Sequence, residues 1–259
     1  MSMNVGIMGC NGRVGKILID ELTSGDWDAR GLVLAGGYAR EGTEVENGFS
    51  VTNDKDELFK NSDVIIDFTL PEGTNAHAKL AVEHKTALIV GTTGLTKDDE
   101  ENLKDASAHT PIVYAANMSI GVNMLLALVE QAAARLESEW DIEIFESHHK
   151  YKVDAPSGTA LALGKSAATG RGNSLENLAE YERHGQIGAR EKGKIGFSVA
   201  RGGDVVGEHT VFFYGEGERL ELTHKATNRS LFAKGALHAA SWIEGKEPGL
   251  YSMRDVLKL

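Results

Sequence analysis

The sequence lacks the features that mark secreted and membrane-spanning proteins. Cys10 is its single cysteine, which excludes an intrachain disulfide framework and fits a reducing cytoplasm. Its longest apolar runs, such as residues 124–129, fall far short of the roughly 20 residues that a membrane-spanning helix needs. Residues 1–4 carry no basic, hydrophobic leader. We therefore expect a cytoplasmic protein that does not associate with membranes.

Positive charge is also scarce, because 27 lysines and arginines stand against 38 aspartates and glutamates, for a formal net charge of -11. A chain of this sign repels the phosphates of nucleic acids and anionic membrane surfaces, so neither is an expected partner. With 41% apolar residues the chain can bury one large core or two modest ones, and its length favours about two domains. The composition fits a soluble enzyme.

One segment, residues 147–159, stands against this negative charge. It combines two imidazoles with two lysine ammonium groups, and its Ser157 lies just before a helical pattern at residues 160–168. The N–H groups at the start of a helix suit a carboxylate. An isolated Ser-Gly-Thr is more often only a helix cap, and a lysine run is more often a solvated surface. Together these groups predict a proton-donating acid and a set of positively charged groups that bind a small, negatively charged substrate.

The two adjacent histidines of this segment, His148 and His149, do not predict a metal site. In extended backbone neighbouring side chains point to opposite sides, so only one of the two would enter a cleft from a regular strand. The sequence also has no cysteine pair and no HExxH pattern that would supply further ligands at recognisable spacing. We expect no metal.

The beginning of the chain has the pattern of a dinucleotide-binding turn. An apolar run at residues 4–8 is typical of a strand, residues 9–15 read Gly-Cys-Asn-Gly-Arg-Val-Gly, and a helical pattern covers residues 14–22. This order lets backbone N–H groups and the positive end of the helix face a pyrophosphate. Asn11 takes the place of the usual second glycine, and asparagine tolerates a positive φ angle better than bulkier residues do. A tight turn without a ligand is the alternative.

Cys10 lies inside this turn and allows a second interpretation. The start of the helix would favour its thiolate, which would make the side chain a nucleophile. A bound phosphate would occupy the same position, however. We therefore interpret the whole turn as part of a cofactor site.

Strands and helices alternate through the rest of the N-terminal half, which predicts a parallel, doubly wound α/β sheet. Ligands of such sheets lie beyond the carboxyl ends of the strands. The loops at residues 67–71, 91–94 and 116–119 are therefore cofactor candidates, although each could equally be a turn with a capping hydroxyl. The expected strands are residues 31–35, 64–68, 87–90 and 112–115, with helical patterns at residues 74–84 and 96–108.

The residues after the second expected strand bear on the choice of cofactor. An acid there would bind the adenosine ribose, whereas an arginine would accept a 2′-phosphate. Arg40 therefore suggests NADPH. Glu41 beside it could instead hold a ribose hydroxyl or pair with the arginine.

The C-terminal half predicts a second sheet. Several strand-like runs follow one another without intervening helices, which favours antiparallel or mixed pairing. The polar, glycine-bearing residues 170–194 predict a mobile region rich in loops. The expected strands are residues 141–146, 195–200, 209–214 and 219–224, with helices at residues 122–136 and 230–243.

Residues 146–161 read Glu-Ser-His-His-Lys-Tyr-Lys-Val-Asp-Ala-Pro-Ser-Gly-Thr-Ala-Leu. This run resembles the E-x-H-H-x-x-K-x-D-A-P-S-G-T-A signature of the 4-hydroxy-tetrahydrodipicolinate reductases, also called dihydrodipicolinate reductases, of the diaminopimelate route to lysine. The resemblance extends along nearly the whole chain. Supporting matches lie at residues 9–15, 66–69, 91–94, 115–117, 207–210 and 224–226.

The resemblance implies a set of site residues, with a small dicarboxylate as the substrate. The expected catalytic residues are His148 and Lys152, as the acid and the proton donor. The expected substrate contacts are His149, Ser157, Gly158 and Thr159. The expected cofactor contacts are Gly9, Cys10, Asn11, Gly12, Arg13, Val14, Arg40, Gly91, Thr92, Thr93, Ala115, Ala116, Asn117 and Met118.

The resemblance also implies the architecture. A Rossmann-like domain would consist of residues 1–119 and 229–259, and a smaller α+β domain with a mixed sheet, residues 120–228, would bind substrate and form a homotetramer. Many members of the family carry an acid before the arginine that follows the second strand. This chain has Ala39 there, which favours NADPH, with NADH as the other possible cofactor.

The reaction implied is the transfer of a hydride from the nicotinamide to an unsaturated cyclic dicarboxylate, in which a nearby proton donor lowers the barrier. A further hypothesis is that the two domains close about the two points where the chain passes from one domain to the other. A regulatory protein that binds a nicotinamide cofactor without catalysis is an alternative, although it would leave the His-His-Lys cluster unexplained. Another amino-acid dehydrogenase is a second alternative.

Overall fold

The computed structural model describes residues 2–40, 48–136 and 138–259. The chain forms two compact units, of which the first comprises residues 1–120 and 229–259 and the second comprises residues 121–228. No helix in the described part of the chain is both long and apolar enough to cross a membrane.

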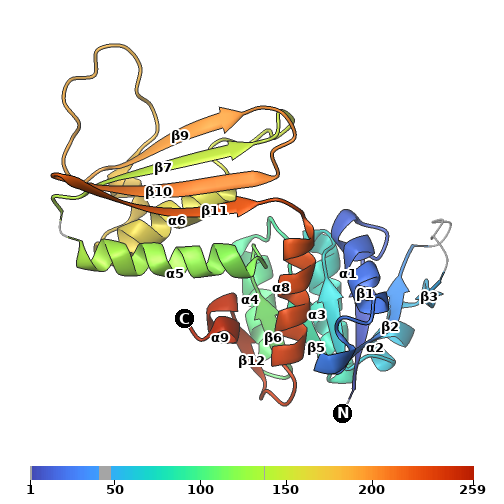
Figure 1. Cartoon of the computed structure of the whole chain (residues 1–259). Helices are drawn as coiled ribbons and strands as arrows, with labels where there is room; N and C mark the ends of the chain where they lie inside the picture. The colour runs from blue at the N-terminus through green and yellow to red at the C-terminus, as the bar shows by residue number, and fades with distance from the viewer. Residues whose placement is uncertain (1, 41–47, 137) are drawn as a thin grey trace. The chain divides into compact units, whose positions relative to one another are not determined.

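The first unit is built on a sheet of seven parallel strands in the order β12-β6-β5-β4-β1-β2-β3 (Figure 1). The predicted doubly wound sheet is thereby confirmed. Its central strands are short runs of apolar residues that are buried on both faces, as parallel sheets require. The strands are β1 (Met3–Met8), β2 (Leu32–Tyr38), β3 (Val51–Thr52), β4 (Val64–Asp67), β5 (Ala87–Val90), β6 (Pro111–Tyr114) and β12 (Gly249–Tyr251).

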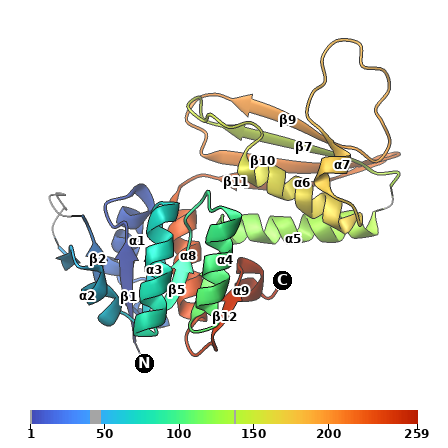
Figure 2. The ribbon, with the colours of Figure 1, turned by 180° about the vertical axis from the view of Figure 1, so that it is seen from behind.

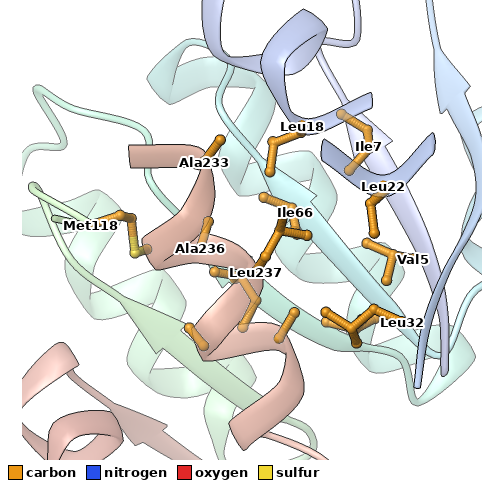
Figure 3. Close-up of a cluster of buried hydrophobic side chains, with 14 of the residues drawn as sticks. Val5, Ile7, Leu18, Leu22, Leu32, Ile66, Met118, Ala233, Ala236 and Leu237 are labelled. Carbon is orange, nitrogen blue, oxygen red and sulfur yellow. The ribbon is translucent and has the colours of Figure 1, made fainter. Parts of the chain in front are cut away.

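Helices cover both faces of this sheet. On one face α1 (Arg13–Thr23) packs beside α8 (Ser230–Trp242), which the chain contributes after it has completed the second unit. Figure 3 shows Leu18 of α1 and Leu237 of α8 over side chains of the central strands, such as Ile66. The other face carries α2 (Lys55–Lys60), α3 (Pro71–His84) and α4 (Lys97–Ser107), while η1 (Asp28–Arg30) and α9 (Met253–Leu257) complete the unit.

One glycine of α8 predicts a large loss of stability on substitution. A Cβ atom added at Gly235 would overlap with the carbonyl oxygen of Met118. Because α8 can relieve this overlap only by moving away from its neighbours, Gly235→Ala is expected to lower the free energy of unfolding by about 3 kcal/mol. Urea unfolding measures this loss. Gly202→Ala is the control, since a Cβ atom there meets nothing within 4 Å, and equal stability of the two variants would contradict the prediction.

The second unit contains a mixed sheet of five strands in the order β11-β10-β7-β9-β8, as predicted (Figure 2). The strand β7 pairs antiparallel with β10 and parallel with β9. Helices α5 (Ile120–Arg135) and α6 (Gly158–Gly170) cover one face and enclose an apolar core with it. The strands are β7 (Asp141–His148), β8 (Ala179–Glu180), β9 (Ile195–Arg201), β10 (Gly207–Gly215) and β11 (Glu218–Ala226).

One expectation needs correction in its extent. The second strand was predicted to end at residue 35, but β2 continues to Tyr38, with a register shift opposite Val5 and Gly6 of β1. The region at residues 170–194 consists mainly of loops, as predicted, and also contains α7 (Leu175–Leu178) and β8. Leu175 is buried in the core of the second unit, and this anchor holds the short helix in place.

Candidate active site

The glycine turn of the first unit follows β1 directly. Gly9 has a φ of +76°, which L-residues with a side chain rarely adopt, and its carbonyl oxygen accepts a hydrogen bond from the Gly12 N–H at 2.8 Å. A Cβ atom at Gly15 would overlap with this same carbonyl group. The tight turn therefore needs glycine at both ends. Among the described residues only Lys85 and Lys258 combine a side chain with a positive φ. The turn therefore does not use the tolerance of Asn11 for such an angle, because the reversal occurs at Gly9.

The start of α1 fits a pyrophosphate. Gly12 is the N-cap residue and provides no side chain to satisfy the first N–H groups of the helix. The first turn also carries no acidic residue that would repel an anion. An anion placed there would receive hydrogen bonds from these N–H groups and would lie at the positive end of the helix.

A pocket of about 370 Å³ opens beside this helix start. Eight of the predicted cofactor residues line it, and they come from the glycine turn and from the loops after β5 and β6. Phe68 and Thr69, from the candidate loop at residues 67–71, line it as well, and so does Phe232, which was not predicted. The eight predicted residues are Arg13, Val14, Gly91, Thr92, Thr93, Ala116, Asn117 and Met118.

Four of the remaining predicted cofactor residues, Gly9, Cys10, Asn11 and Gly12, form the turn itself, and Ala115 precedes the pocket residues after β6. Burial raises the pKa of the Cys10 thiol, although backbone hydrogen bonds act in the opposite direction. The thiol also points to the carbonyl oxygen of Tyr38, with Sγ 3.1 Å from that atom. A buried thiol with a raised pKa is a poor nucleophile, so these observations disfavour the nucleophile interpretation.

Arg40 follows β2 by two residues and is exposed, and it does not line the pocket. Glu41, the neighbour that could compete with it, lies outside the described residues.

In the second unit, the predicted catalytic histidine belongs to a buried cluster around Glu146. Its Nδ1 atom lies 2.6 Å from Glu146 Oε2, and the two side chains share the face of β7 that is turned toward the helices. Arg201 donates one hydrogen bond to each oxygen of Glu146, at 2.7 and 2.8 Å. The Ser157 N–H donates to Glu146 Oε1 at 2.9 Å. One carboxylate therefore holds the histidine, the arginine and the start of α6 together.

Burial and the neighbouring groups shift the pKa values of Glu146 and His148 in opposite directions. Burial alone would raise the pKa of Glu146, but hydrogen bonds from Arg201, His148 and the Ser157 N–H outweigh it, so the pKa lies below its usual value. Burial lowers the pKa of His148, and the charges of Lys152 and Arg201 lower it further, which outweighs the raising effect of Glu146. His148 is therefore a stronger acid than an exposed histidine.

A second imidazole, that of His209, lies against His148 with the ring centroids 5.0 Å apart. Burial and the neighbouring His148 lower the pKa of His209 to about 4, so it is neutral at pH 7. Its Nε2 atom is 2.9 Å from Ser157 Oγ, which also accepts the Ala160 N–H as the N-cap of α6. Ser157 is thus engaged on both its backbone N–H and its hydroxyl.

The predicted catalytic residue Lys152 and the other predicted substrate residues lie in the loop after β7 and at the start of α6. Lys152 Nζ donates to Asp154 Oδ1 at 2.8 Å. The His149 backbone N–H donates to the Val205 carbonyl oxygen at 2.8 Å, outside the end of the strand. Gly158 is exposed at the first position of α6 and Thr159 follows it. Because Ser157 returns to Glu146, this loop brings Lys152 and the helix start back to His148.

Sequence reasoning assigned no role to Glu146, Arg201 or His209. Strand alternation could have found Glu146, because it precedes His148 by two residues and so shares its face. Arg201 and His209 reach the cluster through pairing, since Arg201 lies opposite His148 on β9 and His209 lies opposite Glu146 on β10. That register is not encoded in any local pattern.

The described residues contain no group of three or more histidine, cysteine or acidic side chains that could hold a metal ion.

Family models match nearly the whole chain. The N-terminal model of dihydrodipicolinate reductase matches residues 3–118, and the C-terminal model matches residues 121–257. The 4-hydroxy-tetrahydrodipicolinate reductase of Zymomonas mobilis is 47% identical over 258 residues, which cover 100% of this chain and 98% of that relative. The enzyme of the same name from Burkholderia ambifaria is 46% identical over 99% of this chain and 100% of its own length.

A solved structure shares the fold along the chain. The dipicolinate-bound dihydrodipicolinate reductase from Paenisporosarcina sp. TG-14 is 23% identical and superimposes with a TM-score of 0.81, and the match covers 97% of this chain and 98% of that one.

Proposed function

The chain belongs to the dihydrodipicolinate reductase family, and we propose that it reduces 4-hydroxy-tetrahydrodipicolinate, via dihydrodipicolinate, to tetrahydrodipicolinate. It is an oxidoreductase of the diaminopimelate route to lysine. The observation that carries this proposal is the identity of 44–47% with reductases of this name along the full chain.

The cofactor of this reaction is NAD(P)H, which supplies the hydride when it is bound. The fit of the first unit supports this assignment, because the glycine turn and the uncapped start of α1 suit a pyrophosphate. We further propose that the pocket lined by Thr92 and Asn117 takes the part of the dinucleotide beyond the pyrophosphate. NADPH is the proposed preference, since Arg40 can pair with a 2′-phosphate.

We propose that His148 gives a proton to the substrate from its Nε2 atom. Nδ1 faces Glu146, so the other ring nitrogen is the one available to a substrate. The hydrogen bond to Glu146 fixes the orientation of the ring, and the lowered pKa of His148 strengthens it as an acid. Lys152 lies close enough to affect this pKa, and its ammonium group offsets negative charge that develops on the substrate nitrogen.

The proposed substrate has two carboxylates, and the start of α6 suits one of them. Since Ser157 is buried and uses its own groups within the protein, its role is to hold the helix start in place. We assign the carboxylate contact to Gly158 and Thr159, with His149 beside them. Correct placement of the substrate ring against the proton donor contributes to the rate by orientation.

One assay tests the proposed reaction. Pyruvate and aspartate semialdehyde are condensed enzymatically, and the absorbance of NADPH is followed after this protein is added. Consumption of NADPH that needs both precursors is the expected result. Binding of NADPH without its oxidation under these conditions would favour the regulatory alternative and would overturn the proposal.

Arg40 gives a prediction about cofactor preference. Arg40→Ala is expected to weaken NADPH binding by about tenfold to a hundredfold, because a charge-assisted hydrogen bond contributes about 1.5–3 kcal/mol. It is expected to leave NADH binding nearly unchanged. Isothermal titration of the purified variant with each cofactor measures both affinities. An unchanged ratio of the two dissociation constants would remove the assignment of Arg40 to the 2′-phosphate.

We also propose that the protein is a cytoplasmic homotetramer that assembles through the second unit. The face of its sheet that is turned away from α5 and α6 exposes aromatic side chains, with Phe145 39% and Tyr214 37% accessible. Phe212 stacks on Tyr214 on the same face. Apolar groups gathered on an open sheet face are typical of an interface. Sedimentation equilibrium of the full chain tests this, and a monomer at micromolar concentration would contradict it.

A further inference from the structure

A buried aspartate–histidine pair in the first unit has no role in the chemistry described above. Asp67, the last residue of β4, is fully buried, and His77 of α3 is 1% exposed. His77 Nδ1 lies 2.8 Å from Asp67 Oδ2. A carboxylate at this depth is costly unless donors satisfy it. His77 is the donor that satisfies this oxygen.

The second oxygen of Asp67 leads to the nucleotide pocket. Asp67 Oδ1 accepts hydrogen bonds from the Thr69 N–H at 3.0 Å and from the Thr69 hydroxyl at 2.6 Å, with Thr92 Oγ1 at 3.4 Å. Thr92 Oγ1 also accepts the Thr69 N–H at 3.1 Å. Thr69 and Thr92 both line the pocket. One buried carboxylate thus joins the loops that follow β4 and β5.

These loops are also packed against the glycine turn. A Cβ atom at Gly9 would lie 3.0 Å from both the Phe68 carbonyl oxygen and Thr69 Cγ2, which is closer than such atoms normally approach. A Cβ atom at Gly91 would overlap with the Phe68 ring. A shift of the loop at residues 68–69 would therefore disturb the turn that faces the pyrophosphate.

We propose that His77 is a positioning residue for the nucleotide cofactor. Through Asp67 it holds Thr69 and Thr92 in place, and these two residues fix the wall of the pocket and its distance from the glycine turn. The inference rests on the proposed NAD(P)H-dependent function. It predicts that His77 affects cofactor affinity although it does not line the pocket.

The same helix provides a matched control. His84 of α3 pairs with Asp56 at 2.8 Å, as His77 does with Asp67, and both imidazoles lie near the ring of Phe59, at 6.3 Å for His77 and 6.5 Å for His84. Asp56 is exposed, however, and its side chain does not line the pocket. A general effect of losing a histidine from α3 would therefore appear at both positions.

The experiment is isothermal titration of the full-length protein with NADPH, with KM and kcat measured in parallel. His77→Phe keeps a ring beside Phe59 but removes the donor to Asp67, and is expected to raise the dissociation constant and the KM for NADPH by about tenfold or more. The kcat at saturating NADPH is expected to stay within about twofold, since the positioned loops recover their places once the cofactor is bound. His84→Phe is expected to bind NADPH like the wild type.

Two further variants separate the hydrogen bond from packing. The amide nitrogen of His77→Asn lies where Nδ1 stands and keeps the donor to Asp67, so affinity is expected to stay within about threefold. His77→Gln places its amide where Nε2 stands and is expected to lose affinity as His77→Phe does. This matched pair decides the question if His77→Phe fails to fold, which circular dichroism reports.

The outcomes distinguish the inference from the proposed function. If the wild type does not bind NADPH, the proposed function fails and the inference falls with it. If the wild type binds and the His77→Phe and His77→Gln proteins bind equally well, only the inference is overturned. The inference would also be overturned if His77→Asn and His77→Gln lost NADPH affinity equally. The same holds if His84→Phe lost as much NADPH affinity as His77→Phe.

Discussion

Replacing Lys152 with alanine is expected to lower kcat by about 10²–10³-fold, because a positioned cation or proton donor commonly contributes that much to proton-transfer catalysis. The change removes the ammonium group that acts on His148 and pairs with Asp154. Affinity for NADPH is expected to stay within about twofold, since Lys152 belongs to the second unit and the glycine turn to the first. Steady-state kinetics and cofactor titration measure the two effects.

The neighbouring lysine is the control for this prediction. Lys150 is exposed, and its Nζ atom lies 5.1 Å from the centre of the Tyr151 ring. Lys150→Ala removes the same charge from the same loop, and kcat is expected to change by less than about threefold. Large and equal losses of kcat and NADPH affinity in Lys152→Ala would point to a folding defect. A wild-type kcat in that variant would remove Lys152 from the mechanism.

Replacing Glu146 with glutamine is expected to destabilise the protein by about 3 kcal/mol, because the change leaves the Arg201 guanidinium without its anionic partner. The amide has only one oxygen, whereas the carboxylate accepts from Arg201 on both oxygens and also from His148 and Ser157. Glu143→Gln is the matched control, since Glu143 lies on the opposite face of the same strand and also pairs with arginines. Its loss of stability, measured by urea unfolding of both variants, is expected to be smaller, because the Glu143 side chain is 19% exposed whereas that of Glu146 is 1% exposed.

The pH dependence of stability and of kcat in Glu146→Gln follows from the directions in which the pKa values of Glu146 and His148 are shifted. The pKa of Glu146 is lower in the folded protein than its usual value of 4.5, so its contribution to stability is complete above pH 4.5 and is lost as the pH falls through the folded pKa. Unfolding of the variant is therefore expected to depend less on pH below 4.5. Glu146 also raises the pKa of His148, so its removal should move the alkaline limb of the kcat profile to lower pH. If the alkaline limb of the kcat profile stayed at the same pH in the variant, Glu146 would have no effect on the pKa of the proton donor.

Most elements of the first unit could be predicted because their signals are local. The apolar run of β1, the glycine turn and the periodicity of α1 lie next to one another in the chain, and their order predicts the parallel sheet. The short helices α2 and α9 were missed because each contains too few residues to show a helical period. Their starts are instead defined by the N-cap residues Asp54 and Ser252, whose side chains accept hydrogen bonds from the first N–H groups.

The candidate site could be predicted only in part. Proximity in sequence placed His148, Lys152 and the start of α6 together, and the family signature gave them roles. The side chain that organises them, Glu146, stands in that same signature, but its partner Arg201 lies 55 residues away and arrives through the pairing of β7 with β9. A strand register depends on how whole faces pack, so no short motif could have revealed this contact.

The position of α8 has a consequence for synthesis on the ribosome. Because α8 begins at Ser230 and β12 at Gly249, the sheet built from residues 1–120 lacks a covering helix and an edge strand until the last part of the chain has been made. Residues 121–228 carry their own core and are complete before that. The inserted unit therefore has the first opportunity to fold during translation, while Val5, Ile66 and their neighbours stay without the cover of α8 until that helix has emerged.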